Sequence, residues 1–304
     1  MDWLQKITSA IAYIEDNLDG EIDMEEAARR ACCSSYNFQR MFSFIADVPL
    51  AEYIRRRRMS LAAFDLRGGA KVIDTAVKYG YDSPSAFARA FQAVHGIVPS
   101  AAKESGAALK AYPRISFQIT IKGDKPMQYR IEEKPAFRIF GLEGVFKNDY
   151  SGASPRNPGE FWDQCQKDGD NSPYTALFNN AGTPPAFVSP DLCKIHGACG
   201  YRNTGKGTFP YMLFAFEGEG SKIKGYTAVN IPACTWAVFT SEPFSWDAIG
   251  QNIDLLYKRF YSEWLPASGY AFMEGTCDTL EIYGGLPGSG NCAYIELWFP
   301  IQKK

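Results

Sequence analysis

The sequence lacks the features that mark many enzymes, metalloproteins and membrane proteins. It has only two histidines, His95 and His196, and its eight cysteines include no CxxC pair. We therefore expect no histidine-rich metal site and no serine–histidine–aspartate triad. No run approaches the ~18 consecutive apolar residues of a transmembrane helix. No basic-then-apolar signal opens the chain, so we expect a cytoplasmic protein with reduced thiols.

Charge is present in blocks rather than evenly. Residues 1–28 hold one basic and eight acidic side chains, whereas residues 29–125 hold sixteen basic and seven acidic ones. The remainder is slightly acidic, and the net charge of the whole chain is only −2. Hydrophobic residues make up 46% of the 304, which is enough for packed domains. The basic block is the part of the chain suited to a polyanion such as DNA.

The first third of the chain contains an internal repeat. Its apolar spacing predicts helices at 3–18, 23–31, 34–45, 49–67, 72–79 and 83–95. The repeated residues, 49 positions apart, are Ser34 with Ser83, Phe38 with Phe87 and Phe42 with Phe91. The serines are expected to cap the helices that follow them. A short helix, a turn and a second helix, occurring twice, predict two helix-turn-helix units.

In such a unit the second helix enters the major groove of DNA, and its outward N-terminal side chains reach the base edges. Arg40 and Arg89 occupy equivalent places, two residues after the repeated phenylalanines. An arginine can bind a guanine edge through two hydrogen bonds. The alternative is that both arginines are merely solvated on exposed helix faces. Because the two arginines occupy equivalent sites in a repeated motif, groove contact is the favoured interpretation.

The helix expected at 49–67 joins the two units. A helix of about 17 residues is roughly 25 Å long, which suits two reading heads about one DNA turn apart. One chain is therefore expected to bind DNA as a monomer. Arg55 to Arg58 cover all sides of this helix, so at least one should pair internally with an acid such as Glu52 or Asp65.

Three stretches carry a family signature: SSYNFQRMF at 34–42, EYIRRRR at 52–58 and GYDSPSAFARAFQAVHGIVP at 80–99. They resemble the DNA-binding module of AraC/XylS-type regulators, which implies an all-α domain over residues 1–110. The resemblance places on base-reading positions Tyr36, Asn37, Gln39, Arg40, Ser85 and Arg89. Ala31 and Asp47 stand where the family commonly has glycine. The second reading helix is poor in polar groups, so it is expected to discriminate bases less than the first.

Residues 111–126 form the expected connector, within which 112–121 alternates enough for a strand or an ordered linker. Beyond it a pattern of elements occurs twice. The first copy has strands around Pro135 at 127–146, a helix at 157–168 and strands at 191–201 and 209–217. The second has strands around Pro232 at 225–240, a helix at 245–262 and strands at 277–284 and 292–300. The pattern predicts an α+β domain of two pseudo-twofold βαββ repeats with a cleft between them.

Two acids stand among the apolar residues of the last strands. Alternation puts Glu281 on one face with Tyr283, and Glu296 on one face with Trp298. If these faces line the cleft, carboxylates framed by aromatic rings would suit an organic cation. The alternative is that the faces are exposed and the acids are ordinary surface residues.

The stretches EWLPASGY at 263–270, EIY at 281–283 and ELWFPI at 296–301 resemble the GyrI-like effector-binding domain. The resemblance covers about 127–304 and implies two βαββ repeats around a ligand cleft. The candidate ligand-binding residues are Glu281, Tyr283, Glu296, Trp298 and Trp264. A DNA-binding module followed by this domain is similar to the layout of Rob-like regulators.

These observations predict a DNA-binding transcription regulator that responds to a small cationic or amphipathic organic molecule. The expected partners are double-stranded DNA and the effector, with RNA polymerase as a further candidate and no membrane. No cofactor, no metal and no enzymatic activity are expected. One alternative is a GyrI-like hydrolase in which Glu281 and Tyr283 act as the general base. The other is a DNA-binding protein whose C-terminal domain binds a partner.

Overall fold

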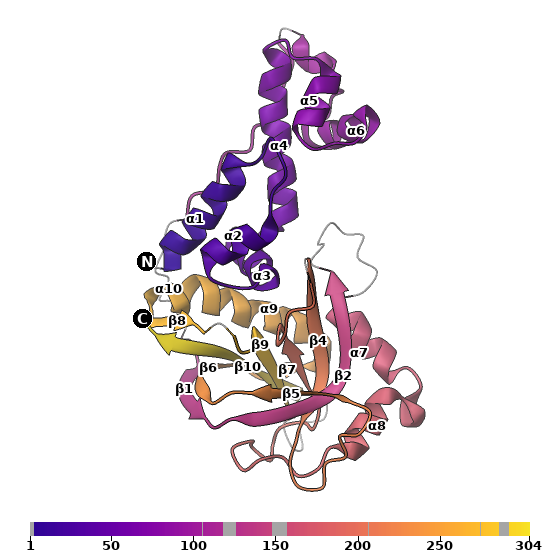
Figure 1. Ribbon diagram of the computed structural model, residues 1–304, viewed down its shortest axis with the longest axis vertical. Helices are drawn as coiled ribbons and strands as arrows, with labels where there is room; N and C mark the ends of the chain where they lie inside the picture. The colour runs from indigo at the N-terminus through magenta and orange to yellow at the C-terminus, as the bar shows by residue number, and fades with distance from the viewer. Residues whose placement is uncertain are drawn as a thin grey trace.

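The computed structural model describes residues 3–104, 106–117, 126–147, 157–205, 207–273, 275–285 and 292–304. The N-terminal helices stand as a column on one face of a C-terminal sheet domain (Figure 1). Helices α5 and α6 lie at the end of the column farthest from the sheet, whereas α2 and α3 rest on the sheet domain.

The N-terminal region contains the six helices that the sequence predicts. Their bounds are α1 Trp3–Asp16, α2 Met24–Ala31, α3 Ser35–Ala46, α4 Leu50–Arg67, α5 Val72–Lys78 and α6 Pro84–His95. The expected caps are present, since Ser34 Oγ accepts from Asn37 N and Ser83 Oγ accepts from Ala86 N, each at 3.1 Å. Satisfying a free backbone N–H in this way stabilises each helix start by about 1 kcal/mol.

The two helix-turn-helix units have separate cores at opposite ends of α4. Phe38 and Phe42 pack with α1, α2 and the start of α4. Phe87 and Phe91 pack with α5 and the end of α4. All four rings are fully buried, and each contributes roughly 1.5–3 kcal/mol by leaving water. The repeat therefore builds two heads, which α4 connects. The first head is the unit around Phe38 and Phe42, and the second head is the unit around Phe87 and Phe91.

The chain leaves the second head along α4. Tyr112 N donates to Ser60 Oγ at 2.9 Å, and the Tyr112 carbonyl accepts from Arg57 at 2.6 Å. Residues 112–117 form an ordered linker rather than a strand. The remainder of the expected strand, 118–121, lies outside the described residues.

The C-terminal region is built on a single sheet. Its strands are β1 Tyr129–Lys134, β2 Phe137–Lys147, β3 His196–Cys199, β4 Thr208–Phe216, β5 Thr227–Ile231, β6 Cys234–Thr240, β7 Phe244–Ser245, β8 Tyr270–Phe272, β9 Thr279–Gly285 and β10 Cys292–Lys303. Its helical elements are α7 Pro158–Gln166, α8 Pro173–Asn180, α9 Ile249–Arg259, a π-helical turn Phe260–Trp264 and α10 Leu265–Ala267. Helix α8 and strands β7 and β8 were not predicted from the sequence.

The strand order confirms the predicted duplication. It runs β1-β6-β10-β9-β3-β4-β2-β5, which is unchanged when each strand of one repeat is exchanged for its counterpart and the order is reversed. Each proline-containing segment forms two strands, because β1 ends before Pro135 and β5 ends before Pro232. Proline has no N–H to donate to a ladder. The strands on either side of each proline pair with the other repeat, β1 with β6 and β2 with β5.

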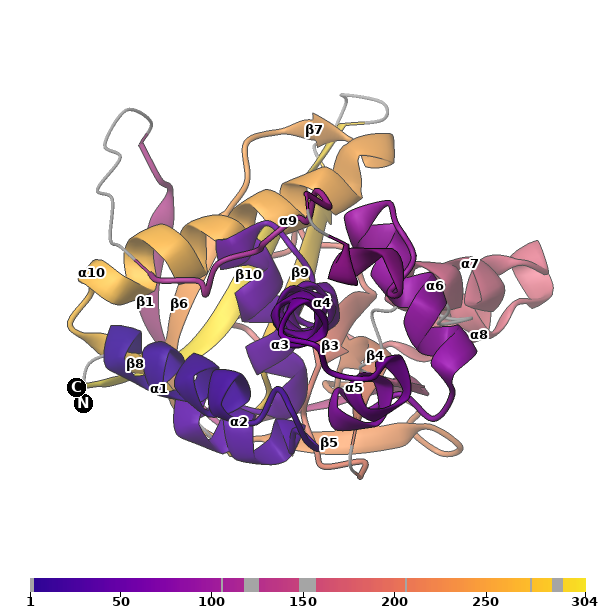
Figure 2. The ribbon, with the colours of Figure 1, turned by 90° about the horizontal axis from the view of Figure 1, so that it is seen from above.

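The two faces of the sheet are covered differently. Helix α9 and the first head lie above the central strands β9 and β3 (Figure 2), and Trp162 of α7 packs on the same face. The opposite face holds a second apolar core around Trp236 and Trp298. A side chain's position along a strand therefore decides which of two unrelated environments it enters.

Candidate functional site

A cavity of about 890 Å³ lies on the helical face of the sheet, between α7 and α9 and beneath α3. Its walls come from α3, from the first repeat of the C-terminal region and from the second repeat. The lining includes Tyr36, Arg40, Ser43, Phe44, Trp162, Tyr174, Ile195, Tyr211, Trp246, Ile253, Asp254, Glu281 and Tyr283. Most of these side chains are aromatic or aliphatic, as in most small-molecule sites.

Glu281, on β9, is the buried carboxylate of this cavity. The residue is only 4% exposed, and its Oε2 accepts hydrogen bonds from Tyr211 at 2.9 Å and from Tyr283 at 2.8 Å. Burial, and then the nearby carboxylate, raise the pKa of both phenols far above its usual range, so both stay protonated and donate. Gly197 on β3 leaves the space they need, because a Cβ there would lie 2.7 Å from Glu281 Oε2.

Aromatic rings surround this carboxylate. The Trp162 indole N–H donates to the Tyr211 hydroxyl at 2.7 Å, and the Trp162 ring meets Tyr283 edge to face at 5.4 Å. Trp246 lies 6.3 Å from the Tyr283 ring. The predicted pairing of Glu281 with Tyr283 on one face is therefore present, inside a cage of rings that presents both negative charge and apolar area.

Arg40, from the first reading helix α3, enters the edge of this cage. Its guanidinium carbon lies 3.7 Å from the Tyr257 ring centroid, and its Nη2 lies 3.8 Å from Glu281 Oε1. Nη1 donates to the Tyr36 hydroxyl at 2.8 Å. Burial opposes the charge of Arg40, but the surrounding phenols, thiol and carboxylate raise its pKa above the usual range. The cage thus already holds a cation, which the chain itself supplies.

The rest of α3 is anchored to the sheet domain around this arginine. Ser34 Oγ donates to Asp278 Oδ2 at 2.8 Å, and the Tyr261 hydroxyl donates to Asn37 Oδ1. At the other end of the helix, Lys258 Nζ pairs with Asp47 Oδ1 at 2.5 Å. Aromatic contacts complete the interface, as the Tyr36 ring stacks on Phe209 and the Phe44 ring stacks on Tyr257.

Tyr36, Asn37, Gln39 and Arg40 were expected to be exposed on the first reading helix, and this is wrong, because the first three are buried and Arg40 is mostly covered. The face of α3 that points away from the core of the first head carries the rings of Tyr36 and Phe44, and the sheet domain covers these rings. Asn37 is only 3% exposed, and the Arg40 side chain only 15%. The aromatic residues Tyr36 and Phe44, on the side away from Phe38, were the available sign that this face would be covered.

The second reading helix matches the expected orientation. Ser85 and Arg89 are exposed on α6, at the end of the column away from the sheet (Figure 1). Equivalent positions of the repeat thus differ in accessibility.

The arginine run on α4 behaves as predicted. Arg56 Nε pairs with Glu52 at 2.6 Å, and Arg55 also contacts Glu52. Arg57 pairs with Glu15 at 2.7 Å. Internal pairing of several of these cations is therefore confirmed.

Glu296 and Trp298 do not line the cavity, so their assignment to one cleft with Glu281 is wrong. On β10 the residue opposite Glu281 is Leu297, so its neighbours 296 and 298 point to the other face of the sheet. There, Glu296 accepts from the Trp298 indole at 2.8 Å and pairs with Arg130 at 2.9 Å. The Lys134 ammonium lies 4.0 Å from the Trp298 ring centroid.

Trp264 also lies outside the cavity. It ends the π-helical turn after α9, is 9% exposed, and packs against Phe239, Phe260 and Tyr270. It borders a separate hollow that Tyr129 and Glu263 also line. The sequence motif that contains Trp264 therefore marks a packed corner of the fold rather than the Glu281 site.

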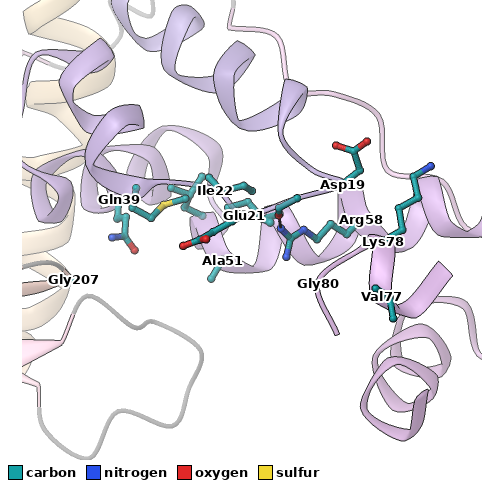
Figure 3. A pocket seen from close by; sticks show the side chains of 14 residues that line it. Asp19, Glu21, Ile22, Gln39, Ala51, Arg58, Val77, Lys78, Gly80 and Gly207 are labelled. Atoms are coloured by element: carbon teal, nitrogen blue, oxygen red, sulfur yellow. Dashed lines mark hydrogen bonds between the residues drawn. The ribbon is translucent and has the colours of Figure 1, made fainter. Parts of the chain in front are cut away.

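A further groove of about 750 Å³ separates the two heads (Figure 3). It is lined by Glu21, Ile22, Gln39, Ala51, Arg58 and Lys78, among others. Arg58 donates to the carbonyls of Leu18 and Gly20 at 2.9 and 2.6 Å, which ties α4 to the end of α1. These contacts hold α4 against the segment that follows α1.

Two family models match the chain. A helix-turn-helix domain matches residues 27–105, and the integron-associated effector binding protein family matches residues 130–301. None of the described helices combines the length and apolarity that a bilayer crossing requires. Within the described ranges, no three potential metal ligands from His, Cys, Asp and Glu converge.

Curated relatives resemble the N-terminal region. The HTH-type transcriptional activator AarP of Providencia stuartii is 40% identical over 95 residues, which is 31% of this chain and 70% of that protein. The regulatory protein SoxS of Salmonella typhimurium is 34% identical over 101 residues, 33% of this chain and 94% of that protein. Among solved structures, an integron cassette protein from the mobile metagenome of Vibrio cholerae is 12% identical, with a TM-score of 0.35, over 57% of this chain and 95% of its own.

Proposed function

The chain belongs to the AraC-type helix-turn-helix transcription regulators and carries a C-terminal effector-binding domain of the integron-associated family, and on this premise we propose that its effector is a small organic cation with aromatic surface, bound beside Glu281. The observation that carries the proposal is the buried Glu281 carboxylate in its aromatic cage. The cavity of about 890 Å³ is large enough for a drug-sized molecule.

The cage matches a cation in charge and in surface. A carboxylate that is almost fully removed from water is stabilised by a nearby positive charge, and the faces of Trp162, Tyr283 and Trp246 attract cations through their quadrupoles. Arg40 provides support from the chain itself, because a planar cation already lies against Tyr257 and near Glu281.

The proposed DNA contacts come from both heads. The base-reading set is Tyr36, Asn37, Gln39, Arg40, Ser85 and Arg89. The α4 helix, with 18 residues, is about 27 Å long, which supports one chain reading two successive turns of the groove as a monomer. We further propose that the protein acts in the cytoplasm and influences RNA polymerase from the bound site.

Regulation rather than catalysis is the role we propose for Glu281. Its Oε2 already accepts from two tyrosines, and its Oε1 lies near Arg40. Both oxygens of the carboxylate are therefore occupied by groups of the chain itself, whereas a general base needs an oxygen within hydrogen-bond reach of the substrate proton.

Two ions of the same shape and opposite charge test the proposal. We expect tetraphenylphosphonium to bind the full chain in calorimetry, and tetraphenylborate, in sodium buffer, not to bind. Glu281→Gln should weaken cation binding at least tenfold, about 1.4 kcal/mol, while the matched Glu296→Gln on the other face should leave it unchanged. Equal binding of the two ions, or equal binding by wild type and E281Q, would contradict a cation site at Glu281.

A further inference from the structure

Helix α3 has one outward face and two possible partners for it. Building on the proposed function, we infer that α3 docks as an internal ligand of the effector site, with Arg40 as its cation. Docking and DNA reading then exclude each other, and an organic cation that takes the place of Arg40 releases the helix for DNA.

Docking and DNA reading use the same side chains. Tyr36, Asn37 and Arg40, which belong to the proposed base-reading set, all contact the sheet domain. A helix with its side chains is 10–12 Å across, and the major groove is about 12 Å wide, so a helix fills the groove by itself. The sheet domain therefore cannot stay on this face while α3 lies in DNA.

The anchoring contacts are of a kind that can be released. Ser34, Asn37 and Asp47 each bond one polar partner on the sheet domain, and all three side chains can bond water after separation. The head keeps its own core of Phe38 and Phe42 with α1 and α2, so undocking does not require unfolding of α3. The interface also contains the stacks of Tyr36 on Phe209 and of Phe44 on Tyr257, so undocking exposes these rings, and the effector's preference for the undocked state has to offset that cost.

The Arg40 guanidinium and the cavity share the Glu281 carboxylate. Glu281 lines the cavity and lies 3.8 Å from the Arg40 guanidinium. An entering cation next to Glu281 meets that guanidinium at close range and is repelled while α3 is docked. It consequently binds more tightly when α3 is undocked, and a ligand shifts an equilibrium only through such a difference in affinity. The docked population in turn lowers the apparent affinity for DNA.

The second head lies outside this mechanism. Ser85 and Arg89 remain exposed on α6 while α3 is docked, and α6 lies at the far end of the column (Figure 1). The docked protein should therefore bind DNA weakly through the second head alone, and release of α3 should add the first head.

A covalent lock tests the exclusion without any effector. Lys258 Nζ and Asp47 Oδ1 are 2.5 Å apart and both side chains are partly exposed, so a water-soluble carbodiimide should join them through an amide bond with loss of water. We expect the 47–258 cross-linked full chain, identified by mass spectrometry, to bind a duplex selected from a random library at least tenfold more weakly than untreated protein.

The control for the lock is Lys258→Arg, which keeps the charge but forms no such amide. This variant, treated identically, should retain its DNA affinity, because any other cross-links remain in it. Undiminished DNA binding by the locked protein would overturn the inference.

A substitution on the sheet domain tests release from the other direction. Tyr261→Phe removes only the hydroxyl that Asn37 accepts from in the docked state. DNA affinity without effector should rise about tenfold, since leaving a buried acceptor without its donor disfavours docking. The matched Tyr226→Phe, whose hydroxyl contacts Asn180 instead, should behave as wild type. Equal DNA affinity of Y261F and Y226F would contradict the docked state as the inhibited one.

The effector experiment separates the two proposals. Saturating tetraphenylphosphonium should raise the DNA affinity of wild type toward that of Y261F and should not change that of E281Q. If the ion binds in calorimetry but leaves DNA affinity unchanged, the release mechanism fails and the effector site stands. If the ion does not bind, the proposed ligand class fails, and the lock and Y261F still decide whether docking blocks DNA.

Discussion

Helices α3 and α6 are copies in sequence and opposites in environment. Both begin with a serine cap, bury two phenylalanines in their own head and carry an arginine at the same position of the motif. Arg89 on α6 is exposed, whereas Arg40 on α3 lies against Tyr257 with 15% of its side chain exposed. The comparison shows that a local motif specifies the shape of a reading head, and that the neighbouring domain specifies whether its face is available.

The residues around the repeated core account for the difference. The outer face of α3 carries the aromatic rings of Tyr36 and Phe44, which pack on Phe209 and Tyr257. The outer face of α6 carries small side chains such as Ser85 and Ala88, which offer little area for a partner. Burial of an aromatic outer face stabilises the folded chain, whereas burial of a face of small side chains stabilises it little.

The largest expected effect separates the two heads by their cores. Phe87→Ala should cost about 3–5 kcal/mol within the second head and raise hydrogen exchange in α5 and α6 while α3 stays protected. Phe38→Ala should cost a similar amount but raise exchange in α3 and in the docked surface of α9 as well, because that head shares a core with the sheet domain. Mass-spectrometric hydrogen exchange measures both. An identical exchange pattern for the two variants would show that the heads do not fold around separate cores.

The next effect distinguishes the two arginines. Arg89→Ala should weaken DNA binding by about 1–3 kcal/mol at one base position and leave tetraphenylphosphonium binding unchanged. Arg40→Ala should relax discrimination at a different base position and tighten cation binding about tenfold, because the internal competitor at Glu281 is gone. Binding-site selection and calorimetry provide the two measurements. Tighter cation binding by R89A, or cation binding by R40A that is no tighter than that of wild type, would contradict the difference between the two helices.

The smallest effect concerns pH and Asp278. Burial raises the pKa of Asp278 to about 7, and its bond from Ser34 and the charge of Arg40 only partly offset this. Cys199, Cys277 and Tyr261 are the other titratable groups that interact with it. Because the pKa of this carboxyl is raised in the docked state, the protonated form of Asp278 favours docking. This stabilisation of the docked state is complete below the ordinary carboxyl pKa near 4, and it is lost as pH rises through 7.

Undocking, and with it DNA affinity, should therefore increase up to about tenfold from pH 6 to pH 8. Asp278→Asn, which is neutral at every pH, should abolish this rise and lower DNA affinity at pH 8. Filter binding across this pH range, with Glu296→Gln as the control, makes the measurement. A slope that D278N shares with the wild type would assign the pH dependence to another group.

Much of the fold follows from patterns that act over short distances. The six N-terminal helices and their serine caps were predictable because apolar spacing and capping are local. The duplicated C-terminal repeat was predictable from two prolines and two strand pairs, although the proline segments exchange between repeats. The strands β7 and β8 were missed because two or three residues carry too little periodicity to detect. The eight-residue helix α8 was missed because, unlike the equally short α2 and α5, it belongs to no internal repeat that would mark it.

The candidate site was predictable in part. Alternation along β9 placed Glu281 and Tyr283 together, and the structure has them hydrogen-bonded at 2.8 Å. The same reasoning paired Glu296 with Trp298 correctly but could not tell that β10 turns them to the opposite face, because the register between neighbouring strands is a non-local property. Tyr211 and Trp162 came from distant segments, and no local pattern announced them.

The amino-acid sequence by itself determined the elements of this protein: two reading heads, a rod between them and a duplicated sheet domain. These depend on propensity, periodicity and capping, which each segment carries within itself. Only the tertiary structure decided that Arg40 lies beside Glu281 rather than in solvent. That pairing joins residues 241 positions apart, and it depends on how two folded surfaces match in shape and charge.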